Sequence, residues 1–320
     1  MGHNSTGGRV IVVGTRQSAL ALTQTGHVID ALKQLCQHHG FSHTFEIRKI
    51  VTKGDRILDV TLSKVGGKGL FVKEIEQALL DGEIDLAVHS MKDMPSELPD
   101  GLLNGAVPKR EDPRDCLITR NGGGIEDLPR GASVGTSSLR RASQLKAYRP
   151  DLEIRSIRGN IDSRIRKLET EGLDAIVLAT AGLKRMGWEE RISSPVGVDI
   201  CIPAVGQGAL GIECREGDAE VRALLALLND SDTEQTVAAE RTFLAALNGG
   251  CQIPIGAYAV ITDRDTNGLT FMLTGMVGSP DGSTILKEIR SGRDPQQLGL
   301  EVAQALRDQG ADRILADIGG

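Results

Sequence analysis

Residues 9–18 read Arg-Val-Ile-Val-Val-Gly-Thr-Arg-Gln-Ser, and the fold class follows from them. The β-branched run that ends at Gly14 predicts a strand, Thr15-Arg16-Gln17-Ser18 a tight turn, and the apolar periodicity of residues 19–35 an amphipathic helix. The same pattern returns at 132–141, where a short strand passes through Gly135-Thr136 into a helix that starts with hydroxyl residues. A strand, turn and helix used twice predict two α/β lobes of similar construction.

A second pair of related segments supports this prediction. Residues 84–90 and 173–180 are both apolar strands that follow an Asp and a helix rich in Glu and Leu. Strands that alternate with helices favour parallel or mixed sheets. Two such lobes usually enclose a cleft, and ligands of open α/β sheets lie beyond the carboxyl ends of the strands. The residues that follow these strands are therefore the first candidates for a site.

The pattern changes near Glu234. A helix, a break at Gly249-Gly250, short strands and a last helix over about 295–309 predict a small α+β domain. The predicted domains are a discontinuous first lobe over 1–108 and 209–228, a second lobe over 109–208, and a third domain over 233–320.

Composition limits the classes of partner. The net charge is −6, and the chain has only five Phe, two Tyr and one Trp. Single-stranded nucleic-acid binders need aromatic platforms, and DNA binders need a basic face. The longest apolar runs are far shorter than the roughly 20 residues of a membrane span, and residues 1–8 lack the apolar core of a signal peptide. We therefore expect a cytoplasmic monomer with no nucleic-acid or membrane partner.

The cysteines indicate one reactive thiol. The five are an odd set without a Cys-x-x-Cys pair: Cys36, Cys116, Cys201, Cys214 and Cys251. This fits neither a disulfide framework nor a zinc site. Cys251 follows two glycines and precedes Gln-Ile-Pro, which predicts an exposed loop suited to covalent chemistry. We expect Cys201 and Cys214 to be buried.

A cationic segment runs from Thr136 to Lys167, with nine Lys and Arg against three acidic residues. Arg140 and Arg141 lie in a first helical turn, where a cation opposes the helix dipole unless an anion is present. Thr136, Ser137 and Ser138 add donors at the same place. Several arginines are typical of carboxylate or phosphate binding, although a solvated helix face remains the alternative for any one of them.

The first lobe repeats this chemistry with Arg16 and Ser18. The Gly-rich segment 64–71 carries Lys64 and Lys68, but Lys68 is followed by Gly, so the segment is not a Walker A motif. No Gly-x-Gly-x-x-Gly follows a strand, and dinucleotide binding is unsupported. These residues predict a site for several carboxylates.

Asp93 is the candidate for acid–base chemistry, because it comes just after the strand at 84–90 in a cationic neighbourhood. A carboxylate there can stabilise a developing cation or move a proton, and the alternative is an N-cap or a partner of Lys92. His89 is expected to be a satisfied core residue. His38, His39 and His43 cluster in a predicted loop without an acidic or Cys companion, so we predict no metal site.

Eight motifs in register resemble the porphobilinogen deaminase (hydroxymethylbilane synthase) family. They are Gly14–Ser18, Lys64–Phe71, Ala87–Asp93, Arg110–Asp115, Gly135–Arg141, Arg158–Asn160, Pro203–Gly208 and Gly249–Gly256. The resemblance runs from Val10 into the C-terminal domain. The departures are Met94, where Val is frequent, and the Gly-rich loop 121–124, and neither touches a motif.

This resemblance implies a three-domain fold whose first two lobes are like periplasmic binding proteins. It implies that four porphobilinogen molecules are deaminated, joined head to tail and released by water as hydroxymethylbilane. A dipyrromethane cofactor would be held by a thioether to Cys251 as the primer. Each ring carries an acetate and a propionate, which accounts for the cations.

The resemblance also assigns residues. Asp93 would be the catalytic carboxylate, which faces the pyrrole N–H where positive charge develops as ammonia leaves. The residues that would bind cofactor and substrate are Arg16, Ser18, Lys64, Lys68, Ser90, Lys92, Thr136, Ser137, Ser138, Arg140, Arg141, Arg158, Arg164, Arg185 and Gln207. Arg185 would also help to bind or release the product.

Two other classes compete with this interpretation. Two α/β lobes with arginines also suit a reversible dicarboxylate binder, but such a binder needs neither an exposed thiol at Cys251 nor a carboxylate at Asp93. A phosphate-binding nucleic-acid protein is disfavoured by the acidic remainder of the chain and the scarce aromatics.

Overall fold

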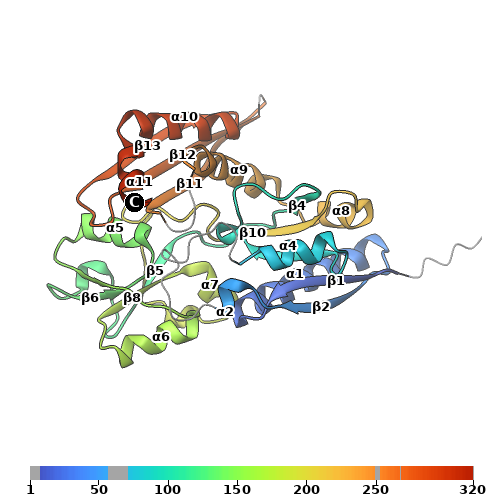
Figure 1. Ribbon diagram of the computed structural model, residues 1–320, viewed down its shortest axis with the longest axis horizontal. Helices are drawn as coiled ribbons and strands as arrows, with labels where there is room; N and C mark the ends of the chain where they lie inside the picture. The colour runs from blue at the N-terminus through green and yellow to red at the C-terminus, as the bar shows by residue number, and fades with distance from the viewer. Residues whose placement is uncertain (1–7, 57–70, 249–252, 267, 320) are drawn as a thin grey trace, which may run out of the picture. The chain divides into compact units, whose positions relative to one another are not determined.

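The computed structural model describes residues 8–56, 71–248, 253–266 and 268–319 (Figure 1). The described chain divides into two compact units. The first holds residues up to 56 together with 71–109 and 210–234, and the second holds 110–209 and the described part of 235–319. The three predicted domain boundaries stay a prediction, as does the cleft between the lobes.

The first unit is built on a mixed five-stranded sheet in the order β2-β1-β3-β10-β4. The strands are β1 (Val10–Arg16), β2 (Thr44–Ile50), β3 (Leu86–Ser90), β4 (Leu102–Ala106) and β10 (Leu210–Arg215). Strands β2, β1 and β3 are parallel, and β10 runs antiparallel to both β3 and β4.

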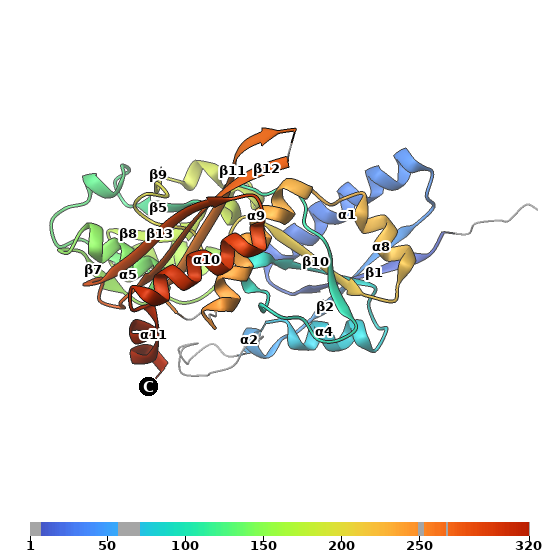
Figure 2. The same cartoon turned by 90° about the horizontal axis from the view of Figure 1, so that it is seen from above.

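Helices cover both faces of this sheet (Figure 2). The helices are α1 (Ala19–His39), α2 (Lys53–Arg56), α4 (Lys73–Leu80) and α8 (Ala219–Ala226), and the 3-10 turn η1 (Met91–Asp93) follows β3. Because side chains alternate along a strand, Ile11 and Val13 pack with α1, whereas Val12 packs with α4. The layer between the sheet and α4 also includes Ala87 of β3.

The second unit contains a sheet of the same construction, in the order β7-β6-β8-β5-β9. Its strands are β5 (Asp115–Thr119), β6 (Ser133–Gly135), β7 (Glu153–Arg155), β8 (Ala175–Ala179) and β9 (Ser194–Pro195). Its helices are α5 (Leu139–Tyr148), α6 (Ile161–Thr170) and α7 (Thr180–Arg185), with 3-10 turns η2 (Ile125–Asp127) and η3 (Glu189–Arg191).

The paired sequence segments occupy equivalent places in the two sheets. Val13 lies opposite Leu86 in the first, and Val134 lies opposite Ala175 in the second. The Asp before each of these strands accepts a backbone N–H of the neighbouring strand, at 2.8 Å for Asp85 and 2.7 Å for Asp174. The prediction of two α/β lobes of similar construction is therefore confirmed.

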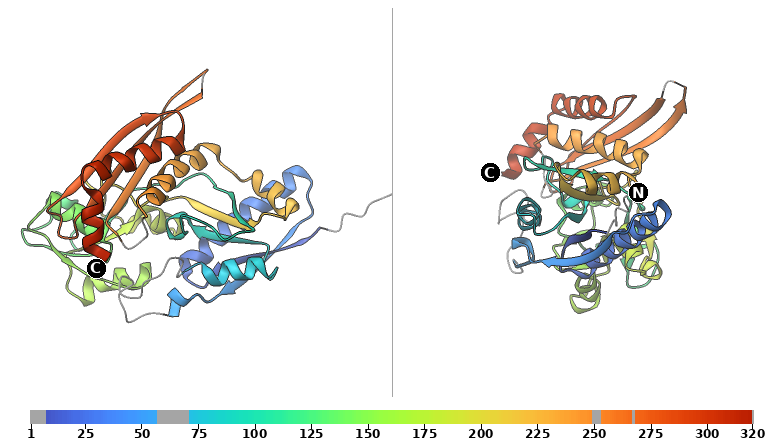
Figure 3. Two further views of the ribbon diagram at one scale, coloured as in Figure 1. Left: turned by 45° about the horizontal axis from the view of Figure 1, so that its top comes forward. Right: turned by 90° about the vertical axis from the view of Figure 1, so that its right-hand side faces the viewer.

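The C-terminal part of the second unit is a three-stranded antiparallel sheet covered by helices (Figure 3). Its elements are α9 (Ser231–Ala246), of which residues 231–234 are counted with the first unit, β11 (Ile255–Asp265), β12 (Gly268–Gly278), β13 (Ile285–Gly292), α10 (Pro295–Asp308) and α11 (Ala311–Gly319). The small α+β architecture is confirmed, whereas α11 was not predicted. Phe243, Phe271 and Leu306 form part of its core.

A buried ion pair joins this sheet to the rest of the second unit. Glu240 of α9 is fully buried and accepts hydrogen bonds from Arg110 at 2.6 Å, from Gly206 N at 2.7 Å and from Ala259 N at 2.9 Å. Arg110 also donates to the Gln207 carbonyl at 2.9 Å. Both carboxylate oxygens of Glu240 therefore have hydrogen-bond partners in the core.

One predicted loop is a helix end. Helix α1 continues to His39 and closes on Gly40, whose φ of 74° is left-handed, so His38 and His39 do not lie in a loop. Among the described residues, none of the helices is both long and apolar enough to cross a membrane. Over the same residues, no group of three or more His, Cys, Asp or Glu is arranged to hold a metal ion.

Candidate active site

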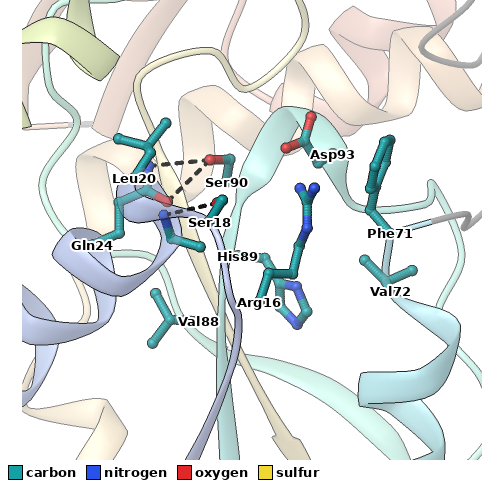
Figure 4. A pocket seen from close by; sticks show the side chains of 11 residues that line it. Arg16, Ser18, Leu20, Gln24, Phe71, Val72, Val88, His89, Ser90 and Asp93 are labelled. Atoms are coloured by element: carbon teal, nitrogen blue, oxygen red, sulfur yellow. Dashed lines mark hydrogen bonds between the residues drawn. The ribbon is translucent and has the colours of Figure 1, made fainter. Parts of the chain in front are cut away.

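A pocket opens at the carboxyl ends of β1 and β3 in the first unit (Figure 4). Strand β1 supplies Arg16, the start of α1 supplies Ser18 and Gln24, β3 supplies His89 and Ser90, and η1 supplies Asp93; Phe71 and Val72 close one side. The pocket lies where the sequence places the first candidates, just past the strand ends. Arg16, Ser18, Ser90 and Asp93 are thus brought together.

Local structure fixes two of these hydroxyls. Ser18 is the N-cap of α1, and its Oγ accepts a hydrogen bond from Ala21 N at 3.3 Å. Ser90 Oγ accepts from Gln24 Nε2 at 3.1 Å (Figure 4). Capping explains why a Ser stands before this helix, and it leaves the Ser18 side chain at the pocket wall.

Arg16 is oriented by two partners that the sequence analysis did not single out. Its Nε lies 3.2 Å from Asp55 Oδ1, and its guanidinium carbon lies 4.2 Å from the ring centre of Phe71. Burial alone would raise the pKa of Asp55, but hydrogen bonds from Arg16 and Thr52 outweigh it and hold that pKa below its usual range. The ion pair with Asp55 and the contact with Phe71 orient the Arg16 guanidinium, which points toward Asp93 (Figure 4).

Asp93 sits at the end of the 3-10 turn η1. The turn is closed by the hydrogen bond from Met94 N to the Met91 carbonyl at 3.1 Å. Met91 and Met94 are buried, whereas Lys92 and Asp93 are half-buried. The buried methionines anchor the turn, so that the Asp93 carboxylate faces the pocket.

In the second unit, the predicted hydroxyl cluster forms the start of α5. Ser138 is the N-cap and accepts from Arg141 N at 3.4 Å, and Thr136 Oγ1 accepts from Ser138 N at 3.2 Å. Ser137 Oγ donates to the Ile157 carbonyl. These contacts confirm that Arg140 and Arg141 lie in the first helical turn.

The anion beside these two arginines is Asp115 of β5. Arg140 Nη1 lies 2.7 Å from Asp115 Oδ2, Arg141 Nε lies 3.0 Å from Oδ1, and Gln207 Nε2 lies 2.9 Å from Oδ1. Asp115 is fully buried, and Arg140 and Arg141 are 4% and 5% exposed. Burial opposes ionisation, but the two guanidinium groups hold the pKa of Asp115 far below its usual range. The cluster therefore carries a net positive charge.

Three further cations lie elsewhere in the second unit. Arg158 follows β7 and Arg164 lies on α6, and both are half-buried. Arg158 Nε is buried and has no hydrogen-bond partner among the described residues. Arg185 at the end of α7 donates to the Gly208 carbonyl at 2.6 Å, and burial lowers its pKa to about 10 although Glu111 opposes that change.

The remaining candidates are the lysines Lys64 and Lys68 and the thiol Cys251, which lie outside the described residues. The other four cysteines are free and buried, which confirms the prediction for Cys201 and Cys214. Burial raises the pKa of Cys201 to about 12, so this thiol is unsuited to nucleophilic chemistry.

Sequence reasoning missed Asp55, Phe71 and Asp115 as parts of these sites. Asp115 and Phe71 each stand in a motif quoted above, but no local signal says what they contact. Asp55 lies outside every motif, and only the folded chain places it beside Arg16.

Two family models match the chain. "Porphobilinogen deaminase, dipyromethane cofactor binding domain" matches residues 11–223, and "Porphobilinogen deaminase, C-terminal domain" matches residues 234–308. The porphobilinogen deaminase of Paenibacillus macerans is 62% identical over 317 residues, which cover 94% of this chain and 98% of that protein. The enzyme of the same name from Bacillus mycoides is 60% identical over 308 residues, covering 96% and 97%.

Solved structures similar to this chain include periplasmic binding proteins. A TRAP periplasmic solute binding protein of Desulfovibrio salexigens has a TM-score of 0.43 at 11% identity, covering 71% of this chain and 73% of its own. A periplasmic binding protein of Salmonella typhimurium has a TM-score of 0.39 at 15% identity, covering 72% and 94%.

Proposed function

The chain belongs to the porphobilinogen deaminase family, and from that premise we propose how its own residues carry out the reaction. The protein is a transferase of tetrapyrrole biosynthesis: it deaminates porphobilinogen and joins four molecules into hydroxymethylbilane on a covalent dipyrromethane primer. The observation that carries the proposal is the pocket that both Arg16 and Asp93 line.

The donor chemistry of the described residues fits a dipyrromethane. The buried, unpartnered Nε of Arg158 and the surplus positive charge of Arg140 and Arg141 suit the carboxylates that each pyrrole carries. When bound, the cofactor supplies the pyrrole carbon from which the product chain grows. Cys251 is the residue that would hold it through a thioether.

Carboxylate binding is the task of the cations. Arg16 in the first unit and Arg140, Arg141, Arg158 and Arg164 in the second would each pair with an acetate or propionate group. Guanidinium groups suit this task because their planar fork donates two parallel hydrogen bonds to one carboxylate. Ser18, Ser90, Thr136, Ser137, Ser138, Lys64, Lys68, Lys92 and Gln207 would complete these contacts, and Arg185 would assist with the product.

Asp93 would act at the reacting carbon. Loss of ammonia places positive charge on the pyrrole, and a fixed carboxylate next to the pyrrole N–H lowers the free energy of that state. The partners of Arg16 support this role, because Asp55 is the carboxylate that accepts hydrogen bonds from Arg16 and the Asp93 carboxylate is left facing the pocket.

The substitution Asp93→Asn tests this assignment. Holoenzyme carrying it should keep its cofactor, as a pyrrolic colour with Ehrlich's reagent and an unchanged mass increment, but turn over porphobilinogen at least about 100-fold more slowly. The matched control is Asp100→Asn, because Asp100 is exposed on the segment that follows. Near wild-type turnover in Asp93→Asn would reject the role.

We also propose that the protein works in the cytoplasm as a monomer on a small-molecule substrate, without a nucleic-acid or membrane partner. The net charge of −6 supports the absence of a nucleic-acid partner. Light scattering coupled to size exclusion would show a single species near the monomer mass, and a concentration-dependent dimer would contradict the proposal.

A further inference from the structure

Gly211 is a buried glycine inside strand β10, opposite His89 of β3 in the register of the first sheet. Its φ lies outside the left-handed region, so its own backbone conformation does not require glycine. A glycine inside a strand weakens that strand, because the backbone loses more entropy on folding and no side chain packs there. The reason for this glycine must therefore come from what packs against it.

The fold does not require a glycine at this place in the sheet. By strand register, Cys116 on β5 occupies the equivalent position in the second sheet, where it pairs with Leu178 as Gly211 pairs with His89. Cys116 is fully buried, so a side chain is accommodated there. The two lobes differ in the segment that follows the neighbouring strand. Strand β8 runs directly into helix α7, whereas β3 runs into the short turn η1 that carries Asp93.

The turn η1 packs on Gly211 through two methionines. A Cβ added at Gly211 would overlap Met94 Sδ, and it would lie 3.1 Å from both Met91 Cε and Asn104 Oδ1. The two methionines are 2% and 4% exposed. The space that a side chain at position 211 would fill is therefore occupied by the residues that precede and follow Lys92 and Asp93.

The backbone beside Met94 leaves little room for adjustment. Pro95 disfavours the helical conformation for the residue before it, and Met94 is extended, with φ −75° and ψ 143°. Its N–H donates to the Met91 carbonyl at 3.1 Å. Methionine side chains adapt readily, so the fold should tolerate an overlap at Gly211. Because both methionines are buried, however, a displaced Met94 side chain would shift the turn that joins them.

Resting on the function proposed above, we propose that Gly211 is a positioning residue for Asp93. Its missing side chain leaves the space in which Met94 seats η1, and the seated turn fixes the carboxylate at the pocket. Such precision matters, because misplacing a group that stabilises developing charge by about 1 Å can cost about 100-fold in rate. Arg16 and Ser18 come from β1 and the start of α1, so carboxylate binding should be affected much less.

The substitution Gly211→Ala tests this role. For the holoenzyme we expect kcat to fall about 10- to 100-fold, with KM changed less than about threefold. The matched control is Gly105→Ala on β4 of the same sheet. A Cβ added there would lie 2.7 Å from Leu225 Cδ1 and 2.8 Å from Cys214 Sγ, which belong to the core with α1 and α8 on the other face. The control should lower the unfolding temperature but keep the wild-type kcat.

Two double variants separate positioning from a general loss of stability. Val at position 94 has no atom in the place of Sδ, so Gly211→Ala with Met94→Val should turn over within about threefold of Met94→Val alone. If Gly211 acts through Asp93, then adding Gly211→Ala to Asp93→Asn should lower kcat no further. A purely structural effect would instead slow both double variants as much as it slows the wild type.

The outcomes distinguish this role from the proposed function. If Gly211→Ala keeps the wild-type kcat, if Gly105→Ala loses as much, or if Met94→Val does not restore turnover, the positioning role is overturned and the proposed function stands. If Gly211→Ala fails to fold, its double variant with Met94→Val decides, and slow turnover or misfolding of that protein overturns the role. A wild-type holoprotein that releases no ammonia from porphobilinogen would instead overturn the proposed function.

Discussion

The substitution Asp115→Asn should destabilise the second unit strongly. Asp115 is the anion between Arg140 and Arg141, and all three side chains are at most 7% exposed. Asn keeps the volume but removes the charge, and its amide NH2 would face guanidinium N–H groups. Two buried cations would then lack a carboxylate, and breaking a buried ion pair in this way costs about 3 to 5 kcal/mol.

The measurement is equilibrium urea unfolding of the wild type and two variants, followed by circular dichroism. The matched control is Asp112→Asn, because Asp112 stands three residues earlier and pairs with Arg114, whose side chain is 43% exposed. A pair whose cation is open to solvent in this way contributes about 1 kcal/mol or less. If Asp115→Asn lowers the free energy of unfolding no more than Asp112→Asn does, the argument that Asp115 holds the two arginines is refuted.

Three other predictions concern the scaffold. Hydrogen bonds from Arg9 outweigh burial and lower the pKa of Asp218 to about 2. The ionised Asp218 therefore contributes to the free energy of unfolding above the unfolded pKa of about 3.9, and this contribution is lost as pH falls toward 2. Asp218→Asn should therefore lower the free energy of unfolding by on the order of 1 kcal/mol at pH 7, after allowance for solvent screening, and by little at pH 2. Equal losses of stability at both pH values would contradict this. Gly208→Ala should lower the free energy of unfolding by about 1 to 3 kcal/mol in urea. Gly208 has a φ of +89°, and an added Cβ would lie 2.4 Å from the Glu111 carbonyl oxygen. An unchanged urea midpoint would contradict this expected backbone strain. Glu240→Gln should lower the melting temperature more than Glu301→Gln does, because Glu301 is only half-buried, whereas Arg110 would be left buried without its anion; similar shifts for the two variants would exclude that reason.

The paired strands could be predicted because they leave a local signal. A β-branched run, a Gly-Thr pair and a capping Ser lie within ten residues of one another, and the Asp before β3 and β8 repeats at an equivalent place. Local periodicity of this kind reports an element and the residues at its end. It therefore placed Asp93 correctly just past β3, whereas β1 continues through Thr15 and Arg16, which pair with Lys49 and Ile50 of β2, so the predicted end of this strand at Gly14 was wrong.

The partners of those residues could not be predicted in the same way. Asp115 lies on β5 and Arg140 on the helix after β6, and the two strands are separated in the second sheet only by β8. His89 contacts Glu213 across 124 positions of sequence through the pairing of β3 with β10. Such contacts depend on strand order, which no local pattern encodes. The predicted helix over 19–35 ends four residues before the observed helix, because α1 continues through His38 and His39 and ends at Gly40.

The central claim is that the chain joins porphobilinogen units onto a covalent primer, and intact-mass spectrometry tests it most directly. Purified protein, before and after a short incubation with limiting porphobilinogen, should show the mass of the chain plus a dipyrromethane, and then a ladder of species one deaminated unit apart. Cys251→Ser should show neither the increment nor the ladder. A wild-type protein that carries no adduct and gains none on incubation would contradict the claim.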